Sequence, residues 1–230
     1  QYASEEQRAV TAIQDNEAQT FYRTDQTSSW RTNAQHFFGN FNEGMAYGFM
    51  PLSSYSSTYN RSIMYFYNRS GYSSCNRLIT WCEPILTSDT LLGIKYVLGD
   101  IAALGYTYNG KSVYTNPYAL ELGYRVSDSI QDSIKADNTF EYQNMLLSRI
   151  VGHDVQCYKP CSSVKEANES GYSWKVSSPQ MNSIIYGYCA PAQGNDLELY
   201  IDGNLRTYYS QWSSYKTFQV GTNDAAEHTV

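Results

Sequence analysis

Apolar residues at helical spacing predict helices in the first two thirds of the chain. Ala9, Val10 and Ile13 share one face of a first helix that has Ser4 as N-cap and ends near Gln19. A second helix is predicted over 58–70, with a C-terminal glycine at position 71, and a third runs from a cap at position 138 to a glycine at 152. A single helical turn, capped by residues 87–89, is expected to end near Leu91.

The same part of the chain also carries strand patterns, which predict strands over residues 20–24, 47–50, 92–98 and 122–126. The segment 92–98 is almost continuously apolar, as is typical of a strand buried on both faces. Asn109-Gly110 predicts a hairpin, because strand-like residues flank it on both sides. Residues 27–42 and the serine-rich segment 53–57 have the polar composition of a loop and a turn.

After Gly152 the helical spacing ends and short alternating segments follow. They cover residues 172–176, 183–188, 197–201, 206–209 and 217–220, with turn signals between them. We therefore predict an α+β chain: an α/β domain with a mixed sheet over residues 1–155, then an antiparallel, jelly-roll-like β-sandwich over 156–230. Residues 227–230 resemble a strand that lacks a partner, so we expect the sandwich to be truncated here.

Charge and hydropathy narrow the possible functions. A net charge of −6 without a Lys/Arg patch excludes a nucleic-acid partner. No run approaches the roughly 20 apolar residues needed to span a bilayer, and the start shows no signal peptide. We therefore expect either a cytosolic protein or a piece of a longer one, and the abrupt start favours the piece. The 23 tyrosines suit both strands and ligand-facing surfaces.

Five cysteines leave three interpretations: two local disulfides, a zinc site, or unpaired thiols, which are less expected in an extracellular protein. Cys75 and Cys82 are close in sequence, as are Cys157 and Cys161, which favours two local disulfides with Cys189 left over. A zinc site is one alternative, but Cys75 and Cys82 are too far apart for ligand spacing, and no histidine stands at a partner spacing. We predict no metal and no cofactor.

Motifs for self-contained catalysis are not found. The sequence has no nucleophile elbow, dinucleotide-binding loop or phosphate-binding loop. A glycosidase needs two carboxylates roughly 5 to 10 Å apart, and the 22 acidic residues allow many pairs. Glu83, Asp89 and Glu121, like Asp100, are interpreted as cap, turn or solvated residues. No catalytic residue is assigned.

Several segments, in one order along nearly the whole chain, together resemble the YfhO family of bacterial membrane proteins. They are Phe21-Tyr22-Arg23, Asn33-Ala34, Ser53-Ser54-Tyr55-Ser56-Ser57, Leu91 to Leu98, Asn116 to Tyr124, Phe140 to Asn144, Leu197 to Gly203 and Val220-Gly221. The resemblance implies a many-pass protein whose membrane part is similar to C-type (GT-C) glycosyltransferases. Such proteins are associated with adding sugars from a lipid-linked donor to cell-envelope polymers such as lipoteichoic acid. The catalytic loop of that fold is not recognisable here.

Six polar residues in these segments are candidate substrate-binding residues: Arg23, Asn33, Ser56, Ser57, Lys95 and Asn116. Lys95 interrupts an apolar strand, so it either binds an anionic group, pairs with an internal carboxylate or reaches the surface. Asn33 and Asn116 either line a cleft or fix turns. In the sandwich, sugar stacking is a further possibility, set against a purely structural role, for Tyr200, Tyr208, Tyr209, Trp212 and Tyr215.

The resemblance leads to one functional hypothesis and two alternatives. The chain is expected at the extracellular face of the cell membrane, where it positions a lipid-linked sugar or a cell-envelope glycopolymer for the protein's own transmembrane region. One alternative is a non-enzymatic carbohydrate-binding surface module. The other is an independent glycoside hydrolase.

Overall fold

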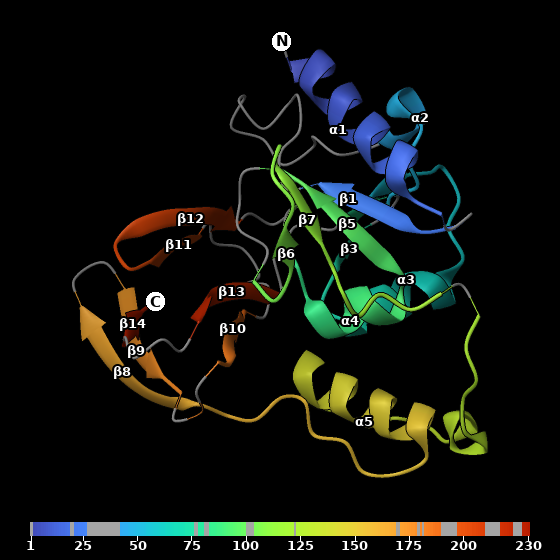
Figure 1. Cartoon of the computed structure of the whole chain (residues 1–230). Coiled ribbons are helices and arrows are strands. Elements are labelled where there is room, and N and C mark those ends of the chain that lie inside the picture. The colour runs from blue at the N-terminus through green and yellow to red at the C-terminus, as the bar shows by residue number, and fades with distance from the viewer. Residues whose placement is uncertain are drawn as a thin grey trace.

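A computed structural model describes residues 2–18, 21–26, 42–75, 78–80, 83–99, 104–121, 123–168, 171–178, 180, 182–189, 197–209, 217–222 and 227–230. These residues form an α+β fold with a mixed sheet in the N-terminal part and antiparallel sheets in the C-terminal part, as predicted (Figure 1). The loop expected over 27–42 lies outside the described residues except for Asn42.

The N-terminal part is built on a four-stranded sheet in the order β1-β5-β7-β6. β1 (Arg23–Gln26) is parallel to β5 (Ile94–Leu98), whose other neighbour is the antiparallel β7 (Val113–Thr115). β7 forms the predicted hairpin with β6 (Thr107–Tyr108). The apolar side chains of β5 are buried because both faces of the strand are covered: Leu98 packs in an apolar cluster on one face, and Ile94 and Val97 pack in a cluster on the other face, which confirms the prediction for this segment.

Helices and a second small sheet cover the two faces of this mixed sheet. On one face, α1 (Tyr2–Asn16) packs against Leu98 and Val113 beside the short α2 (Glu43–Tyr47). On the other face, Val97 packs with Tyr72, Ile79 and Ile85 in a second apolar cluster, beside the sheet β2-β4-β3. This second sheet and its flanking helices comprise β2 (Ser54–Tyr55), α3 (Arg61–Arg69), β3 (Ser73–Cys75), β4 (Leu78–Thr80) and α4 (Leu86–Leu91). Figure 1 shows α1 and α4 on opposite sides of the mixed sheet.

The helix α5 (Thr139–Val151) has the ends that its sequence predicts. Asn138 accepts hydrogen bonds from the N–H groups of Phe140 and Glu141, each at 3.0 Å, and Gly152 ends the helix in the left-handed region at φ 82°. α5 packs on α4 through Leu146 and Leu91, next to the 3-10 helix η2 (Asp128–Gln131).

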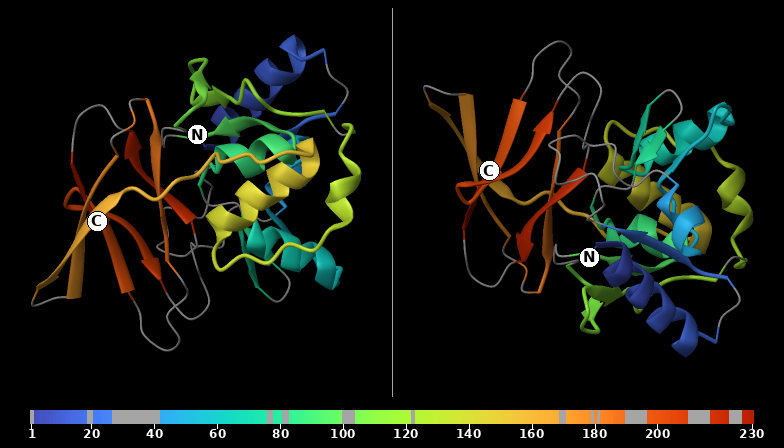
Figure 2. Two further views of the ribbon diagram at one scale, coloured as in Figure 1. Left: turned by 90° about the horizontal axis from the view of Figure 1, so that it is seen from below. Right: turned by 90° about the horizontal axis from the view of Figure 1, so that it is seen from above.

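The C-terminal part, coloured orange to red in Figure 2, consists of three antiparallel sheets. They share one apolar core, with Val176 from the first, Ile185 and Phe218 from the second, and Leu199 packed on it from the third, which is the packing expected of a sandwich. The first sheet has the order β14-β9-β8, with β14 (His228–Thr229), β9 (Gly171–Ser177) and β8 (Ser162–Asn168). The other two pair β10 (Ile184–Tyr188) with β13 (Thr217–Thr222), and β11 (Leu197–Ile201) with β12 (Asn204–Tyr209).

The structure corrects several predicted elements. α1 starts at Tyr2, so Ser4 lies inside the helix and is not its N-cap. Residues 47–50 are not a strand, because Tyr47 ends α2 and Gly48 closes its last turn at φ 80°. The strand expected over 122–126 is irregular at the described positions 123–126. The segment at 227–230 does have a partner, because His228 and Thr229 pair with β9.

The cysteines differ from the preferred sequence interpretation. Cys157 and Cys161 are free thiols, so the predicted bridge between them is wrong. Cys189 packs against the core of the C-terminal part. The pairing predicted for Cys75 involves Cys82, which lies outside the described residues.

Candidate functional site

Three of the predicted site residues, Arg23, Lys95 and Asn116, lie at the connection from α4 to β5. The guanidinium of Arg23 donates a hydrogen bond to the carbonyl oxygen of Leu92, and the Arg23 backbone N–H donates to Gly93 at 2.8 Å. The amide of Asn116 donates to the carbonyl oxygen of Ile94 at 3.1 Å. Arg23 and Asn116 therefore hold the backbone that leads into β5.

Asn116 has the turn-fixing role that was one of its two predicted roles. Its side chain is buried and donates to Thr90 Oγ1 at 3.3 Å as well as to Ile94. Its Oδ1 accepts the N–H of Tyr118 at 3.0 Å, and its own N–H donates to Lys95 at 2.8 Å. Because these bonds occupy the buried amide, Asn116 is a positioning residue of this connection.

Lys95 pairs with an internal carboxylate, as one of its predicted alternatives stated. Its Nζ lies 2.6 Å from Glu17 Oε2. The same oxygen accepts the hydroxyl of Tyr96 at 2.7 Å, and burial, followed by this bond to Glu17, raises the pKa of Tyr96 well above its usual range. The ammonium therefore neutralises a carboxylate whose side chain is only 6% exposed.

Two tyrosines, Tyr59 and Tyr67, connect the serine-rich segment 53–57 with the surroundings of Arg23. Ser54 Oγ is 2.5 Å from the hydroxyl of Tyr59. The pKa of Tyr67 is raised by burial, with the charge of Arg23 opposing the shift and Tyr59 adding to it. Arg23, Ser54, Tyr59 and Tyr67 are all half-buried, and we call them the arginine–tyrosine group. The group places one cation in the neighbourhood of three hydroxyls, and such a combination suits a phosphate or a sugar hydroxyl.

The remaining predicted residues lie outside this group. Ser56 Oγ donates to the carbonyl oxygen of Thr58 at 3.0 Å and accepts its N–H at 3.3 Å, so it shapes the turn before α3. Ser57 is exposed. Asn33 lies outside the described residues. Of the sandwich tyrosines, Tyr200 donates to Glu198 at 2.7 Å, and the side chains of Tyr208, Tyr209, Trp212 and Tyr215 lie outside the described part.

Sequence patterns did not identify the buried acids next to this group. Asp25 is fully buried at the end of β1 and accepts the N–H groups of Leu52 at 2.8 Å and Ser53 at 3.1 Å. Burial outweighs these bonds and raises the pKa of Asp25 to about 7. The acid lies within the short polar strand β1, so neither apolar periodicity nor a motif marks it.

A second buried acid, Asp89, lies in the first turn of α4. It accepts the hydroxyls of Tyr72 and Tyr106, each at 2.6 Å, and the N–H of Ile85 at 2.9 Å. Because α4 begins at Leu86, residues 87–89 lie inside the helix and do not precede it as its N-cap, so the predicted cap position is wrong; Asp89 instead accepts the N–H of the residue before the helix. Burial and the charge of Asp89 raise the pKa values of both tyrosines, which keeps their hydroxyls protonated as donors.

A third acidic cluster lies between α1 and α2. The side chain of Glu6 is buried, and its pKa rises to about 7, through burial first and the charge of Glu43 second. Gln26 donates to Glu43 Oε2 at 2.5 Å. The Glu6 carboxyl is therefore partly protonated near neutral pH.

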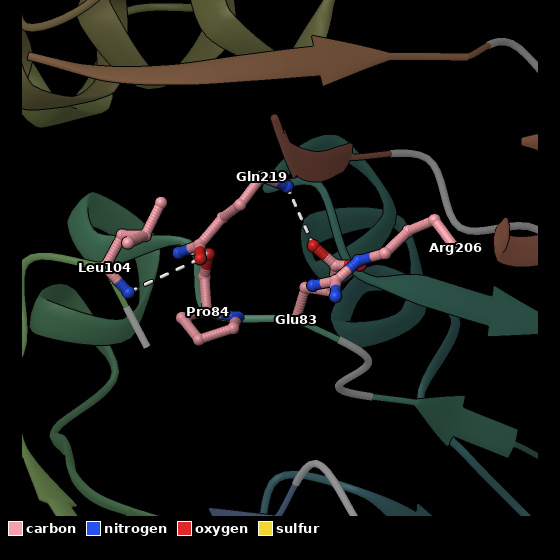
Figure 3. A network of polar contacts seen from close by, with 5 residues as sticks. All are labelled: Glu83, Pro84, Leu104, Arg206 and Gln219. Carbon is pink, nitrogen blue, oxygen red and sulfur yellow. Dashed lines mark hydrogen bonds and ion pairs between the residues drawn. The ribbon is translucent and has the colours of Figure 1, made fainter. Parts of the chain in front are cut away.

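Glu83 links the N-terminal and C-terminal parts, although the sequence suggested a cap, turn or solvated residue. It forms an ion pair with Arg206 of β12 at 2.8 Å and accepts the N–H of Gln219 of β13 at 2.7 Å (Figure 3). The side chain of Gln219 donates to Pro84 at 3.0 Å and accepts the N–H of Leu104 at 3.4 Å. These contacts cross the boundary expected at residue 155, and the division into two domains stays a prediction.

Membrane-spanning helices and metal-binding groups are not found among the described residues. Within these ranges, no helix combines the length and the apolar character that a membrane crossing requires. In the same part of the chain, no three His, Cys, Asp or Glu side chains are grouped so that they could bind a metal ion.

Comparison with protein families gives a match over nearly the whole chain. A family model described as bacterial membrane protein YfhO matches residues 1–228. Comparison with curated proteins gives no match, and comparison with solved structures gives none. All segments on which the sequence resemblance rested lie inside the matched range.

Proposed function

Since this chain belongs to the YfhO family of bacterial membrane proteins, we propose that it is the extracellular part of a multi-pass, glycosyltransferase-like protein. In this proposal the protein transfers sugar from a lipid-linked donor to a cell-envelope polymer of the teichoic-acid type. The chain itself is non-catalytic and positions the donor or the acceptor for the transmembrane region. The observation that carries the proposal is the family match over residues 1–228.

The arginine–tyrosine group is the positioning site in this proposal. Its guanidinium offers a permanent positive charge for a phosphate, and the hydroxyls of Ser54, Tyr59 and Tyr67 can exchange hydrogen bonds with sugar hydroxyls. Lys95 and Asn116, which were predicted to bind substrate directly, support this site by holding β5 and its entry.

Deletion of residues 1–230 from the full-length protein tests this function. We expect the sugar substituents of the cell-envelope polymer to disappear, while a variant carrying Val164→Ala, at an exposed position, retains them. Substitution of both Tyr59 and Tyr67 by Phe should reduce the substituents without changing the amount of protein in the membrane. Normal decoration after deletion of the whole region would rule out the proposal.

One feature favours the hydrolase alternative. Burial and the charge of the nearby Glu43 raise the pKa of Glu6 to about 7, which suits a general acid. Turnover of a chromogenic glycoside by the purified chain, lost in both Glu6→Gln and Glu43→Gln, would support this alternative. The surface-module alternative predicts binding to host glycans on an array and normal polymer decoration after the deletion.

A further inference from the structure

The hairpin formed by β8 and β9 exposes two aromatic rings on one face. Tyr172, Trp174 and Val176 alternate along β9, so their side chains point to the same side of the sheet. Val176 is in the core at 9% exposure, whereas Trp174 is 37% and Tyr172 is 61% exposed. The face that is buried at Val176 therefore emerges into solvent toward the end of the hairpin, which reaches away from the N-terminal part (Figures 1 and 2).

The two rings form a tilted pair with a lysine beside them. Their centroids are 6.1 Å apart and their planes make an angle of 49°. Lys165, directly across from Trp174 in the register, places its Nζ 3.7 Å from the centroid of Tyr172 and 5.4 Å from that of Trp174. We call Lys165, Tyr172 and Trp174 the aromatic platform.

The neighbours of the platform leave its rings accessible and its charge positive. Ala167 stands across from Tyr172 and Ser163 across from Val176, and both side chains are too small to cover the rings. The ion pair between Glu166 and Lys175, at 3.2 Å, involves positions of the opposite face. Among the residues that the structure describes, no carboxylate therefore forms an ion pair with Lys165 on its own side.

Fold stability does not explain this arrangement. An exposed cation–π contact contributes about 0.5–1 kcal/mol, and Tyr172, which is 61% exposed, gains little from burial. Two exposed aromatic rings beside a lysine are instead suited to a ligand with an apolar face and a negative charge. The C–H face of a sugar ring packs on an aromatic ring, and a phosphate oxygen accepts hydrogen bonds from an ammonium group.

From this geometry we infer that the aromatic platform binds a saccharide polymer that carries phosphate groups. A sugar ring packs on Trp174 and Tyr172, and Lys165 turns from the ring to the phosphate. The inference deepens the proposed function and rests on it for the polymer class, and it adds a second contact, on β8 and β9, to the one at the arginine–tyrosine group.

Binding to the purified 230-residue chain tests the inference by calorimetry with three probes. The probes are delipidated poly(glycerol phosphate) with sugar substituents, neutral dextran, and vesicles of phosphatidylglycerol and phosphatidylcholine. We expect the first probe to bind most tightly, with affinity that falls as salt rises. Trp174→Ala and Tyr172→Ala should each weaken it at least about tenfold, and Lys165→Gln should remove the preference over dextran.

Val164→Ala is the matched control, because Val164 is 60% exposed on the opposite face of the same hairpin. It should bind as the unchanged chain does, and equal melting temperatures would show that all variants fold. Absence of polymer binding, or binding that survives both ring substitutions, would overturn the inference. Binding to vesicles alone would also overturn it, in favour of a membrane-surface contact. None of these binding results decides the outcome of the deletion experiment, which measures polymer decoration in cells.

Discussion

Arg206 of β12 and Glu83, which precedes α4, form an ion pair of 2.8 Å across the two parts of the molecule. The two residues are 123 positions apart in sequence. The Glu83 side chain is 3% exposed, and the N–H of Gln219 donates to its other oxygen. The pair therefore satisfies a carboxylate that water does not reach.

Arg206→Met should destabilise the fold, because it leaves the Glu83 carboxylate buried with one remaining donor. We expect the free energy of unfolding in urea to fall by about 3 kcal/mol. Lys175→Met is the matched control, since its ion pair with Glu166 is about half exposed at both ends and should contribute less than about 1 kcal/mol. Equal losses in the two variants would contradict the role assigned to Arg206.

The stability of the chain should decrease as pH rises from about 4 to about 7. The pKa of Asp25 rises from 3.8 to about 7 on folding, so in this window the folded state holds a proton that the unfolded state has released. Glu6 shifts in the same direction. Each group lowers the free energy of unfolding by at most about 1.4 kcal/mol per pH unit, and the loss levels off above about pH 7.

Urea titrations between pH 4 and pH 8 measure this dependence. Asp25→Asn should reduce the slope of the free energy of unfolding against pH. Glu6→Gln should also reduce this slope, because its pKa shifts in the same direction. A free energy of unfolding that rises across the window, and loses this rise in Asp25→Asn, would show that the backbone donors of Leu52 and Ser53 outweigh the burial of Asp25.

Asn116→Ala should destabilise the connection that leads into β5. The substitution removes the donor to Ile94 and the acceptor for Tyr118, and we expect a loss of about 2 kcal/mol in the free energy of unfolding. Ser57→Ala, at an exposed turn position, should change it by less than about 0.5 kcal/mol. If Asn116→Ala were as stable as the unchanged chain, the positioning role of Asn116 would be wrong.

Gly187→Ala should overpack the core of the C-terminal part. A Cβ atom at Gly187 would lie 2.2 Å from the Phe218 ring, which is buried. We expect a loss of about 2 kcal/mol and a lower melting temperature. Gly123→Ala is the control, because a Cβ there meets nothing within 4 Å. A stable Gly187→Ala variant would mean that Phe218 can move aside.

Local signals determined much of the fold. Asn138 and Gly152 bound α5 as predicted because a cap and a terminating glycine act within a few residues. The run from Ile94 to Leu98 predicted a central strand, because hydrophobic patterning is also a property of neighbouring residues. The strand β8 was missed, because its sequence Ser-Ser-Val-Lys-Glu-Ala-Asn has no apolar alternation and β9 stabilises it by pairing.

The sequence by itself determined the α+β class, both ends of α5, most strands and the family. Only the tertiary structure decided that Lys95 meets Glu17, that Arg206 meets Glu83 and that Asp25 is buried. Caps and periodicity depend on neighbours along the chain, whereas a charge buried in the fold depends on a partner that folding brings from far away. The arginine–tyrosine group and the aromatic platform depend in the same way on which faces the packing leaves open.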